Sequence, residues 1–373
     1  MRAANILLLG LKELRGLARD PAMLALIVFA FTFSIYSAST AMPEQLNKAA
    51  IAIVDEDRSP LSARIADAFF PPFFMPPSMI AQPEMDHRMD AGIDTFALDI
   101  PPEFQRDLLA GRRPTIQLNV DATRMSQAFT GAGYVQSIVA SEIDAFVRRY
   151  RANVPASVEL TLRARFNPSL TISWFGSVIE VVNNVTMLSI ILTGAALIRE
   201  REHGTIEHLL VMPVTPLEIM AGKIWSMALV VLTACALSLL LVVQGLLAVP
   251  LQGSVALFLA GAAVHLFATT SLGVFLATVA RSMPQFGLLL ILVLLPLEML
   301  SGGTTPRESM PEIVQYLMLA APTTHFIMLA QAILFRGAGF ETVWPQFIAL
   351  AVIGLLLFTM ALARFRKAVG ETA

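Results

Sequence analysis

Residues 197–223 read LIREREHGTIEHLLVMPVTPLEIMAGK, a dense group of charges between two long apolar runs. They stand in a chain of 373 residues in which 56% are hydrophobic, 14% are charged and the mean hydropathy is +0.68. An average soluble domain carries about 25% charged residues, so this composition excludes an ordinary soluble protein. The segment is therefore expected to join two membrane-spanning helices.

Apolar stretches long enough to cross a bilayer recur along the chain, since a crossing needs about 20 residues. Six such stretches are found, at about 22–41, 175–198, 219–247, 253–280, 285–300 and 345–363. The fifth is the weakest, because it is short, Pro296 interrupts it and Glu298 lies near its end. The sequence predicts an α-helical membrane protein with about six spans, the fifth bent or partly re-entrant, and a count of five stays open.

The first 20 residues mix apolar and basic side chains at helical spacing, with Lys12, Arg15 and Arg19 between the leucines. They predict an amphipathic helix over 1–20 that lies on the inner membrane surface. Pro21 then separates this helix from the first span, 21–41. The charges beyond the first turn and the missing cleavage site argue against a secretory signal, so the helix is expected to be retained.

Lysines and arginines in the short flanks of the spans set the predicted orientation. They fall on one side of a six-span arrangement: Arg2, Lys12, Arg15, Arg19, Arg199, Arg201, Lys223, Arg281, Arg364, Arg366 and Lys367. The other side keeps only Arg307 and Arg336 in its later loop. Both termini, including the tail 364–373, are therefore predicted to be cytoplasmic, with residues 42–173 on the other side of the membrane.

Residues 42–173 are long enough for a small domain with a core of its own. Their patterns predict two strands, at 49–57 and 114–123, and two helices, at 59–70 and 127–150. The intervening FFPPFFMPPSM, residues 69–79, contains four prolines and is expected to form a loop or an apolar flap. An inserted extracytoplasmic α/β domain follows.

The segment quoted at the outset is then a cytoplasmic loop, 199–218, within the membrane part of the chain, 174–363. Gly204 predicts a turn, and Thr205 then caps a short amphipathic helix that ends before Pro213. A charged collar and such a helix form a docking surface, for which the candidate residues are Glu202, Gly204, Thr205, Glu207, Leu209, Leu210 and Pro213. For the glutamates, including Glu218, a merely solvated helix face stays open.

The pattern RERExGTxExLLxxPVxxxExxxGK over Arg199–Lys223 resembles the first cytoplasmic loop of ABC-2 type transporter permeases, particularly those of drug exporters. IVDEDRSPLS, DIPPEFQRDLLAGRRPTIQLNVDAT and FNPSLTISWF are similar to that family as well. The resemblance implies a transmembrane subunit that pairs with a second, identical or related permease. It also implies two cytoplasmic ABC ATPase subunits that drive the coupling loop.

The chain itself has no phosphate-binding loop, since Gly222 and Lys223 are followed by isoleucine and lack the earlier glycine. No cofactor is expected on this chain, and ATP and Mg belong to the partner ATPases. His203 and His208 lack further metal ligands in the loop, so no metal site is predicted. The basic residues form no stripe, which argues against nucleic acid.

Polar residues inside the spans are candidates for the substrate path, because they are costly in lipid unless they face a cavity or a partner. They are Glu180, Asn183 and Asn184 in the second span and Glu298 in the fifth. For Glu180, snorkelling to the outer surface stays open. His265 is expected to bond to a neighbouring helix instead.

The resemblance implies an inner-membrane permease that exports small amphipathic or hydrophobic compounds, driven by ATPase subunits. It also implies that residues 42–173 lie in the periplasm, with a periplasmic adaptor as a further partner. Two alternatives stay open. One is a nonenzymatic receptor or assembly factor. The other is a membrane-embedded enzyme that uses His325 beside Thr323 and Thr324, although no complete set of acid, nucleophile and base is visible.

Overall fold

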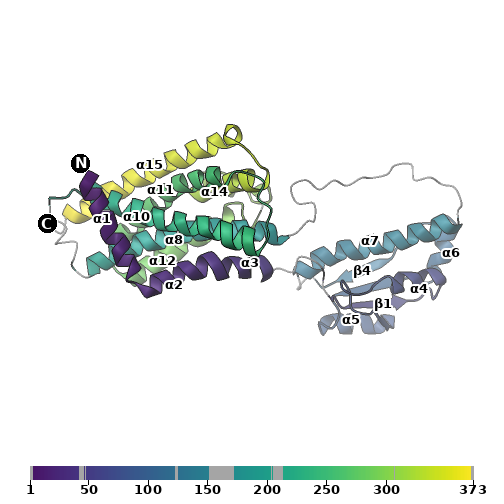
Figure 1. Ribbon diagram of the computed structural model, residues 1–373. Coiled ribbons are helices and arrows are strands. Elements are labelled where there is room, and N and C mark those ends of the chain that lie inside the picture. Colours follow the sequence, from purple (N-terminus) through teal and green to yellow (C-terminus); the bar gives the residue numbers. More distant parts are fainter. Residues whose placement is uncertain are drawn as a thin grey trace. The chain divides into compact units, whose positions relative to one another are not determined.

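The computed structural model describes residues 3–41, 46, 48–121, 125–150, 172–202, 204, 213–305 and 307–370. The chain divides into two compact units, whose elements are labelled in Figure 1. The helical unit comprises Met1–Met42 and Ala164–Ala373, and the α/β unit comprises Pro43–Arg163. Each unit is described by itself.

Six helices or helix runs of the helical unit are long and apolar enough to cross a membrane, which confirms the predicted fold class. They are Pro21–Thr40, Trp174–Glu202, Pro216–Leu246, Val255–Val279, Met283–Leu300 and Phe340–Lys367. Their elements are α2 (Pro21–Phe29), η1 (Ala30–Ser34), α3 (Ile35–Ala41), α8 (Ile172–Glu202), α10 (Pro216–Ser238), η2 (Leu239–Leu246), α11 (Val255–Val279), α12 (Met283–Leu300) and α15 (Phe340–Gly370). The amphipathic N-terminal segment forms α1 (Ala3–Ala18), as predicted.

Capping residues explain where several of these helices begin. Thr215 accepts a hydrogen bond from the Glu218 backbone N–H at the start of α10, and Pro216 occupies the first helical turn. Ser254 and Ser282 cap α11 and α12 in the same way. The stretches η1 and η2 are π-helical, and they continue the spans that contain α2 and α10.

The fifth span is not the bent one. Although Pro296 lies inside α12, the helix runs without a break from Met283 to Leu300. The bend comes later, where α13 (Glu312–Met318) meets α14 (Pro322–Ala330) and η4 (Gln331–Phe335) at 90°. A short 3₁₀ turn, η3 (Arg307–Ser309), precedes α13.

The bent segment leaves and returns at the same end of the helical unit. Ser301 and Arg307, which precede it, and Arg336, which follows it, line one cavity of about 400 Å³. The segment is therefore re-entrant, and the number of spans among the described residues stays at six. The segment could not be recognised as membrane-embedded from its sequence, because Pro322 divides it into two short helices with little continuous apolar length.

Helix α8 lies at the centre of the helical unit and packs most closely on α11. The Gly273 Cα approaches the Ile190 backbone so closely that an added Cβ would lie 2.7 Å from the Ile190 carbonyl oxygen. Thr186 bonds His265 at 2.9 Å, as expected for that histidine, and Ser189 donates to Thr269 at 2.6 Å. Small residues and hydroxyl pairs hold helices together where water is absent.

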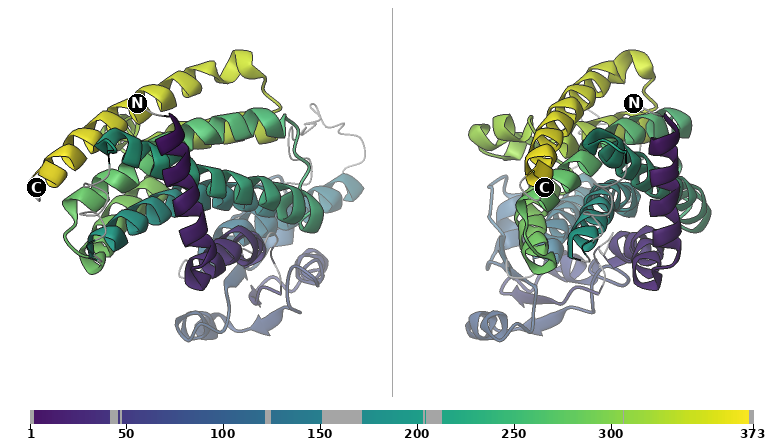
Figure 2. Two further views of the ribbon diagram at one scale, coloured as in Figure 1. Left: turned by 60° about the vertical axis from the view of Figure 1, so that its left-hand side comes forward. Right: turned by 90° about the vertical axis from the view of Figure 1, so that its left-hand side faces the viewer.

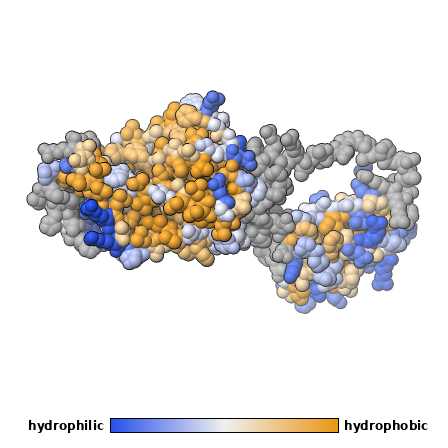
Figure 3. Space-filling model, in the orientation of Figure 1, coloured by the Kyte–Doolittle hydropathy of each residue, from blue (hydrophilic) through white to orange (hydrophobic). Residues whose placement is uncertain are grey.

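Large apolar side chains cover the outside of the helical unit, as Figure 3 shows for the face in view. Leu288 and Leu292 on α12 are each 70% exposed, and Leu241 on η2 is 66% exposed. A soluble protein rarely exposes so large an apolar surface, whereas lipid tails cover it without cost.

The α/β unit contains a four-stranded sheet in the order β2-β1-β3-β4, with β1 parallel to β2 and β3 and with β3 antiparallel to β4. The strands are β1 (Ile51–Asp55), β2 (Ser78–Ile80), β3 (Phe96–Ile100) and β4 (Gln117–Val120). The helices are α4 (Pro60–Asp67), α5 (Gln82–Asp90), α6 (Phe104–Leu109) and α7 (Met125–Tyr150). Both predicted strands and both predicted helices are confirmed, while β2, β3, α5 and α6 were not predicted.

The proline-rich stretch 69–79 contributes to the core of the α/β unit instead of forming an exposed flap. Phe69 and Phe74 are 2% and 0% exposed, and their rings meet edge to face with centroids 5.0 Å apart. Phe96 of β3 packs against Phe74 in turn. The stretch also keeps exposed side chains, namely Phe70, Met75 and Met79.

Candidate functional site

The charged loop of the sequence begins where α8 ends, at Glu202, and finishes where α10 begins, at Pro216. Helix α1 crosses the first turns of α10 in both views of Figure 2. The Trp225 indole N–H donates to the Ile6 carbonyl at 3.1 Å, and Gly10 lies directly against the indole ring. The two ends of the loop thus lie at a junction of three helices, α1, α8 and α10.

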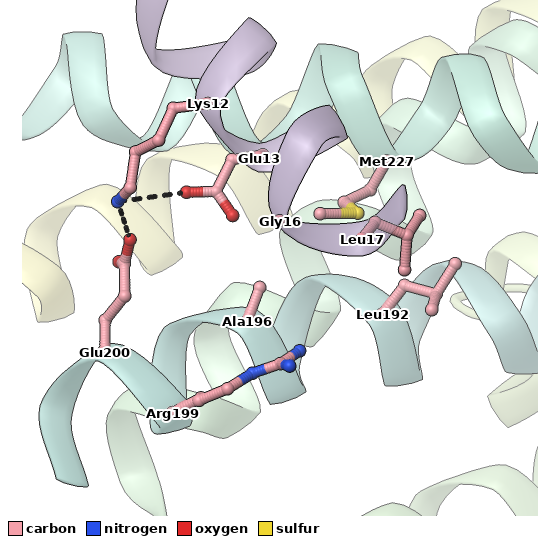
Figure 4. A pocket seen from close by; sticks show the side chains of 9 residues that line it. All are labelled: Lys12, Glu13, Gly16, Leu17, Leu192, Ala196, Arg199, Glu200 and Met227. Carbon is pink, nitrogen blue, oxygen red and sulfur yellow. Dashed lines mark hydrogen bonds and ion pairs between the residues drawn. The ribbon is translucent and has the colours of Figure 1, made fainter. Parts of the chain in front are cut away.

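Four charged side chains connect the three helices of this junction, and we call them the charged cluster: Lys12, Glu13, Glu200 and Lys223. Lys223 on α10 is only 2% exposed and lies 2.8 Å from Glu13 on α1 and 2.6 Å from Glu200 on α8. Lys12 bonds Glu200 and lies 3.6 Å from Glu13, as Figure 4 shows. Two cations and two carboxylates leave the cluster with no net charge.

The environment of Lys12 favours its charged form. Burial alone lowers the pKa of Lys12, but the hydrogen bond to Glu200 and the attraction of Glu200 and Glu13 outweigh it and raise the pKa above its ordinary value of 10.5. The ion pairs therefore persist at any physiological pH. Removing one partner of such a pair strands a buried charge, which costs about 3–5 kcal/mol.

A further ion pair joins α8 to the start of the first span. Arg199 donates to Asp20 at 2.5 Å, and the same carboxylate caps α2 by accepting from the Met23 backbone N–H at 3.2 Å. The bond from Met23 and then the bond from Arg199 hold the pKa of Asp20 below its ordinary value of 3.8. Asp20 thus ties the α1–α2 corner to α8.

The end of α8 is also fastened to the α11–α12 corner. The Arg201 guanidinium donates to the backbone carbonyls of Ala280 at 2.5 Å and Ala277 at 3.2 Å. Glu202 accepts from the Met283 backbone N–H at 2.9 Å. A displacement of the end of α8 would therefore reach the first, fourth and fifth spans through hydrogen bonds.

Three of the predicted coupling residues are described. Glu202 is exposed although it bonds Met283. Gly204 has a left-handed φ of +66° and bonds Arg201 O through its N–H, the geometry with which glycine ends a helix. Pro213 is exposed just before α10. The other four, Thr205, Glu207, Leu209 and Leu210, lie outside the described residues, so the short helix stays a prediction.

One glutamate of the loop has a role that was not predicted. Glu218 is 3% exposed, and its carboxylate accepts from the Thr215 backbone N–H at 2.9 Å while its own N–H donates to the Thr215 side chain. This capping box starts α10, and Asn5 of α1 donates to the same carboxylate. Glu218 therefore belongs neither to a solvated face nor to an exposed docking surface. The T-x-x-E spacing could have revealed it.

A groove of about 340 Å³ lies beside the charged cluster, between α1, α8 and α10. Its floor is apolar and contains Leu17, Leu192 and Met227, whereas Lys12 and Arg199 stand at its rim (Figure 4). An apolar floor with a charged rim matches an amphipathic molecule.

The candidate residues of the substrate path lie partly together. Glu180 accepts from Ser34 of η1 at 2.6 Å and from Asn184 at 3.4 Å, and Asn184 also donates to the Ala30 carbonyl. Glu298 of α12 is half-buried and interacts electrostatically with Glu180. The Asn183 side-chain oxygen is buried without a hydrogen-bond partner. Glu180 therefore pairs inside the helical unit, which disfavours simple snorkelling.

The residues of the enzyme alternative do not form a catalytic arrangement. His325 bonds the Leu319 carbonyl at 2.9 Å, and the hydroxyls of Thr323 and Thr324 are fully buried without partners. Within the described ranges, no three potential metal ligands of the His, Cys, Asp and Glu types gather in one place.

Comparison with known proteins decides the family. The profile described as ABC-2 family transporter protein matches residues 22–363. This chain belongs to that family. The inner membrane transport permease YhhJ of Escherichia coli K12 is 63% identical over 369 residues, which is 99% of either chain. The probable multidrug ABC transporter permease YbhR of the same strain is 28% identical over 368 residues, covering 96% of this chain and 97% of the relative.

The predicted resemblance to ABC-2 permeases is thereby confirmed. Membership of this ABC-2 family implies separate ATPase subunits as partners. The charged cluster of this permease was missed by sequence reasoning, which interpreted Lys12, Glu200 and Lys223 as loop or orientation charges. The pairs Lys12–Glu200 and Lys223–Glu13 join residues about 200 positions apart in the chain, so no local pattern shows them.

Proposed function

We propose that this ABC-2 permease is the membrane-spanning subunit of an ATP-driven exporter in the inner membrane that moves small amphipathic or hydrophobic compounds outward. The names of its relatives, an inner membrane transport permease and a probable multidrug ABC transporter permease, support the location and the cargo class. The observation that carries the proposal is the charged cluster, which fastens both ends of the loop 199–218 to one helix, α1.

The proposed coupling begins with ATP binding, which moves the ATPase subunits that contact residues 199–218. Because Lys223 and Glu200 hold α8 and α10 against α1, the loop ends move as one body and do not separate. Arg201 and Glu202 pass the displacement to α11 and α12. Motion of packed helices then opens the substrate path.

The proposed path follows α8, where Glu180 and Asn184 face η1 inside the helical unit. Glu298 on α12 contributes a second carboxyl group nearby. The groove beside α1 suits the first contact with an amphipathic compound, because its apolar floor meets a charged rim. Asn183 completes the candidate set on the same helix.

The proposed assembly contains two permeases, identical or related, two cytoplasmic ABC ATPases that hold ATP and Mg, and a periplasmic adaptor that meets the α/β unit. The ends of α8 and α15 and the starts of α10 and α12 carry the basic flanks, which supports cytoplasmic termini and a periplasmic α/β unit. A nonenzymatic receptor or assembly factor is the alternative, and it predicts no dependence on ATP.

The test uses the tagged full chain purified from its host, together with inside-out vesicles that take up the lipophilic dye Hoechst 33342. Gly204→Pro and the double change Leu209→Asp with Leu210→Asp should abolish ATP-dependent uptake and release the copurified ATPase, while membrane insertion persists. Gly204→Asn is the matched control, since asparagine tolerates the left-handed φ and no atom lies within 4 Å of the added Cβ.

Two outcomes would overturn the proposal. One is dye uptake that is equal with and without ATP. The other is a full complement of ATPase and undiminished uptake in Gly204→Pro.

A further inference from the structure

Another cavity of the helical unit lies at the far end of α12 from the charged cluster. The first residue of α12, Met283, bonds Glu202, whereas Ser301, just after its last residue, lines this cavity. We call the cavity, of about 400 Å³, the arginine pocket. Its polar lining consists of Ser301, Thr304, Arg307, Gln331 and Arg336.

Hydrogen-bond donors in the arginine pocket lack adequate acceptors. Among described groups, the Arg307 guanidinium reaches the Met328 sulfur and the Gln315 carbonyl, both at 3.4 Å, and its buried Nε has no described partner. The Ser301 side chain is 0% exposed, and its Oγ also has no partner. Leaving such groups unsatisfied costs about 1–3 kcal/mol each.

The pocket has positive charge without a compensating carboxylate. Among the side chains that the structure describes, none that lines the pocket is acidic, and neither Arg307 nor Arg336 forms an ion pair with one of them. Lys12, Arg199 and Lys223 at the other end of the unit all have carboxylate partners. An anion with several acceptor oxygens would match both the positive charge of the arginines and the unsatisfied hydrogen-bond donors.

Gly302 and Gly303 allow the loop to pack closely beside Arg307. Gly302 has a left-handed φ of +96°, and an added Cβ would lie 2.9 Å from the Arg307 side chain. Gly303 packs as closely on Ile179 of α8. The loop 301–305 therefore presses against the Arg307 stem and α8, and the guanidinium is preorganised for a ligand.

We propose that the arginine pocket binds a phosphate group. Guanidinium groups recognise phosphate through paired hydrogen bonds, and Ser301 adds a neutral donor. Ile327 and Met328 supply an apolar wall beside them. Because the pocket lies between the end of one span and the start of another, at the level of lipid headgroups, an anionic phospholipid is one source of the phosphate and the free ion is the other.

The test starts from the full-length permease stripped of lipid in dodecyl maltoside. Phosphatidylglycerol and inorganic phosphate are titrated separately, with unfolding temperature and native mass spectrometry as readouts. We expect one phosphatidylglycerol to stay bound, and Arg307→Gln to weaken binding about tenfold or more, as loss of a charged hydrogen bond does. Ser301→Ala should weaken it several-fold. Saturation by inorganic phosphate alone would assign the same site to the free ion.

The matched control is Arg281→Gln, because Arg281 is an exposed arginine at the opposite end of α12. Equal binding by Arg307→Gln and Arg281→Gln would overturn the proposal, as would the absence of binding by either phosphate compound. If Arg307→Gln fails to fold, Arg336→Gln replaces it, since that side chain is exposed and its loss leaves the packing intact. Unchanged binding in Arg336→Gln would then count against the pocket.

Discussion

At one end of α8 and α12 the four charges of the cluster formed by Lys12, Glu13, Glu200 and Lys223 neutralise one another, whereas Arg307 at the other end has no described carboxylate partner. The first end ties three helices together with paired, nearly buried groups. The second end keeps donors unsatisfied around a cavity. The contrast teaches that the paired end is built to hold its helices in register and the unpaired end to receive a ligand.

The largest effect is expected from Lys223→Met, which leaves Glu13 and Glu200 facing each other in a buried position. Loss of one partner should cost about 3–5 kcal/mol of unfolding free energy. ATP-dependent uptake of Hoechst 33342 should fall as the stability falls. Arg366→Met, which replaces an exposed arginine near the end of α15, is the control and should change neither quantity. Unfolding in mixed micelles measures both variants. Equal stabilities would contradict the claim that the charged cluster holds its helices together.

A smaller effect is expected where α1 meets α10. In Gly10→Ala the new Cβ would lie 2.1 Å from the Trp225 ring, so the helices must separate at a cost of about 1–3 kcal/mol. Gly16→Ala in the same helix has no atom within 4 Å and should gain up to about 1 kcal/mol from helix propensity. The same unfolding experiment compares them, and a stabilised Gly10→Ala would contradict the close packing of α1.

Two serine changes should have opposite signs in the lipid-free protein. Ser189→Ala removes the bonds to Thr269 and to the Thr186 carbonyl, which should cost about 0.5–1.5 kcal/mol. Ser301→Ala removes a buried hydroxyl that has no partner, so it should be neutral or slightly stabilising. A loss in Ser301→Ala as large as that in Ser189→Ala would show that the hydroxyl is satisfied without a ligand.

The smallest effect concerns Asp20 and pH. Because the folded pKa of Asp20 lies below 3.8, its ionised form stabilises the fold above that pH, and the stabilisation disappears as the pH falls through the folded pKa. The difference in unfolding temperature between wild type and Asp20→Asn should therefore be constant from pH 7 to about pH 5 and should shrink below about pH 4. A difference that instead changes around neutral pH would point to another group.

Much of the fold can be predicted from the sequence because its signals are local. The six apolar runs, the strand at 49–57 and the capping serine of α4 each depend on neighbours in the chain. The re-entrant α13–α14 segment was missed because each helix is too short to be recognised as membrane-embedded. The strand β3 was missed because a short apolar run fits a helix or a strand equally well.

The candidate site could be predicted only in outline. The motif at 199–223 located the loop and the family, but it could not show that Lys223 is buried, since Glu13 lies 210 positions away. Likewise nothing local distinguishes Arg307, inside a cavity, from an ordinary loop arginine. Burial and pairing are tertiary properties, and they decide which charges hold the helices and which bind.

The most direct test measures whether α1 and the end of the loop just before α10 move together. Spin labels at Leu8→Cys and Pro213→Cys, both exposed, report one distance in the permease bound to its ATPase, while the buried Cys235 stays unlabelled. With the charged cluster intact, the distance should be the same without nucleotide and with a slowly hydrolysed ATP analogue, and in Lys223→Met it should change. A distance that changes equally in both proteins, or in neither, would contradict the proposed rigid coupling.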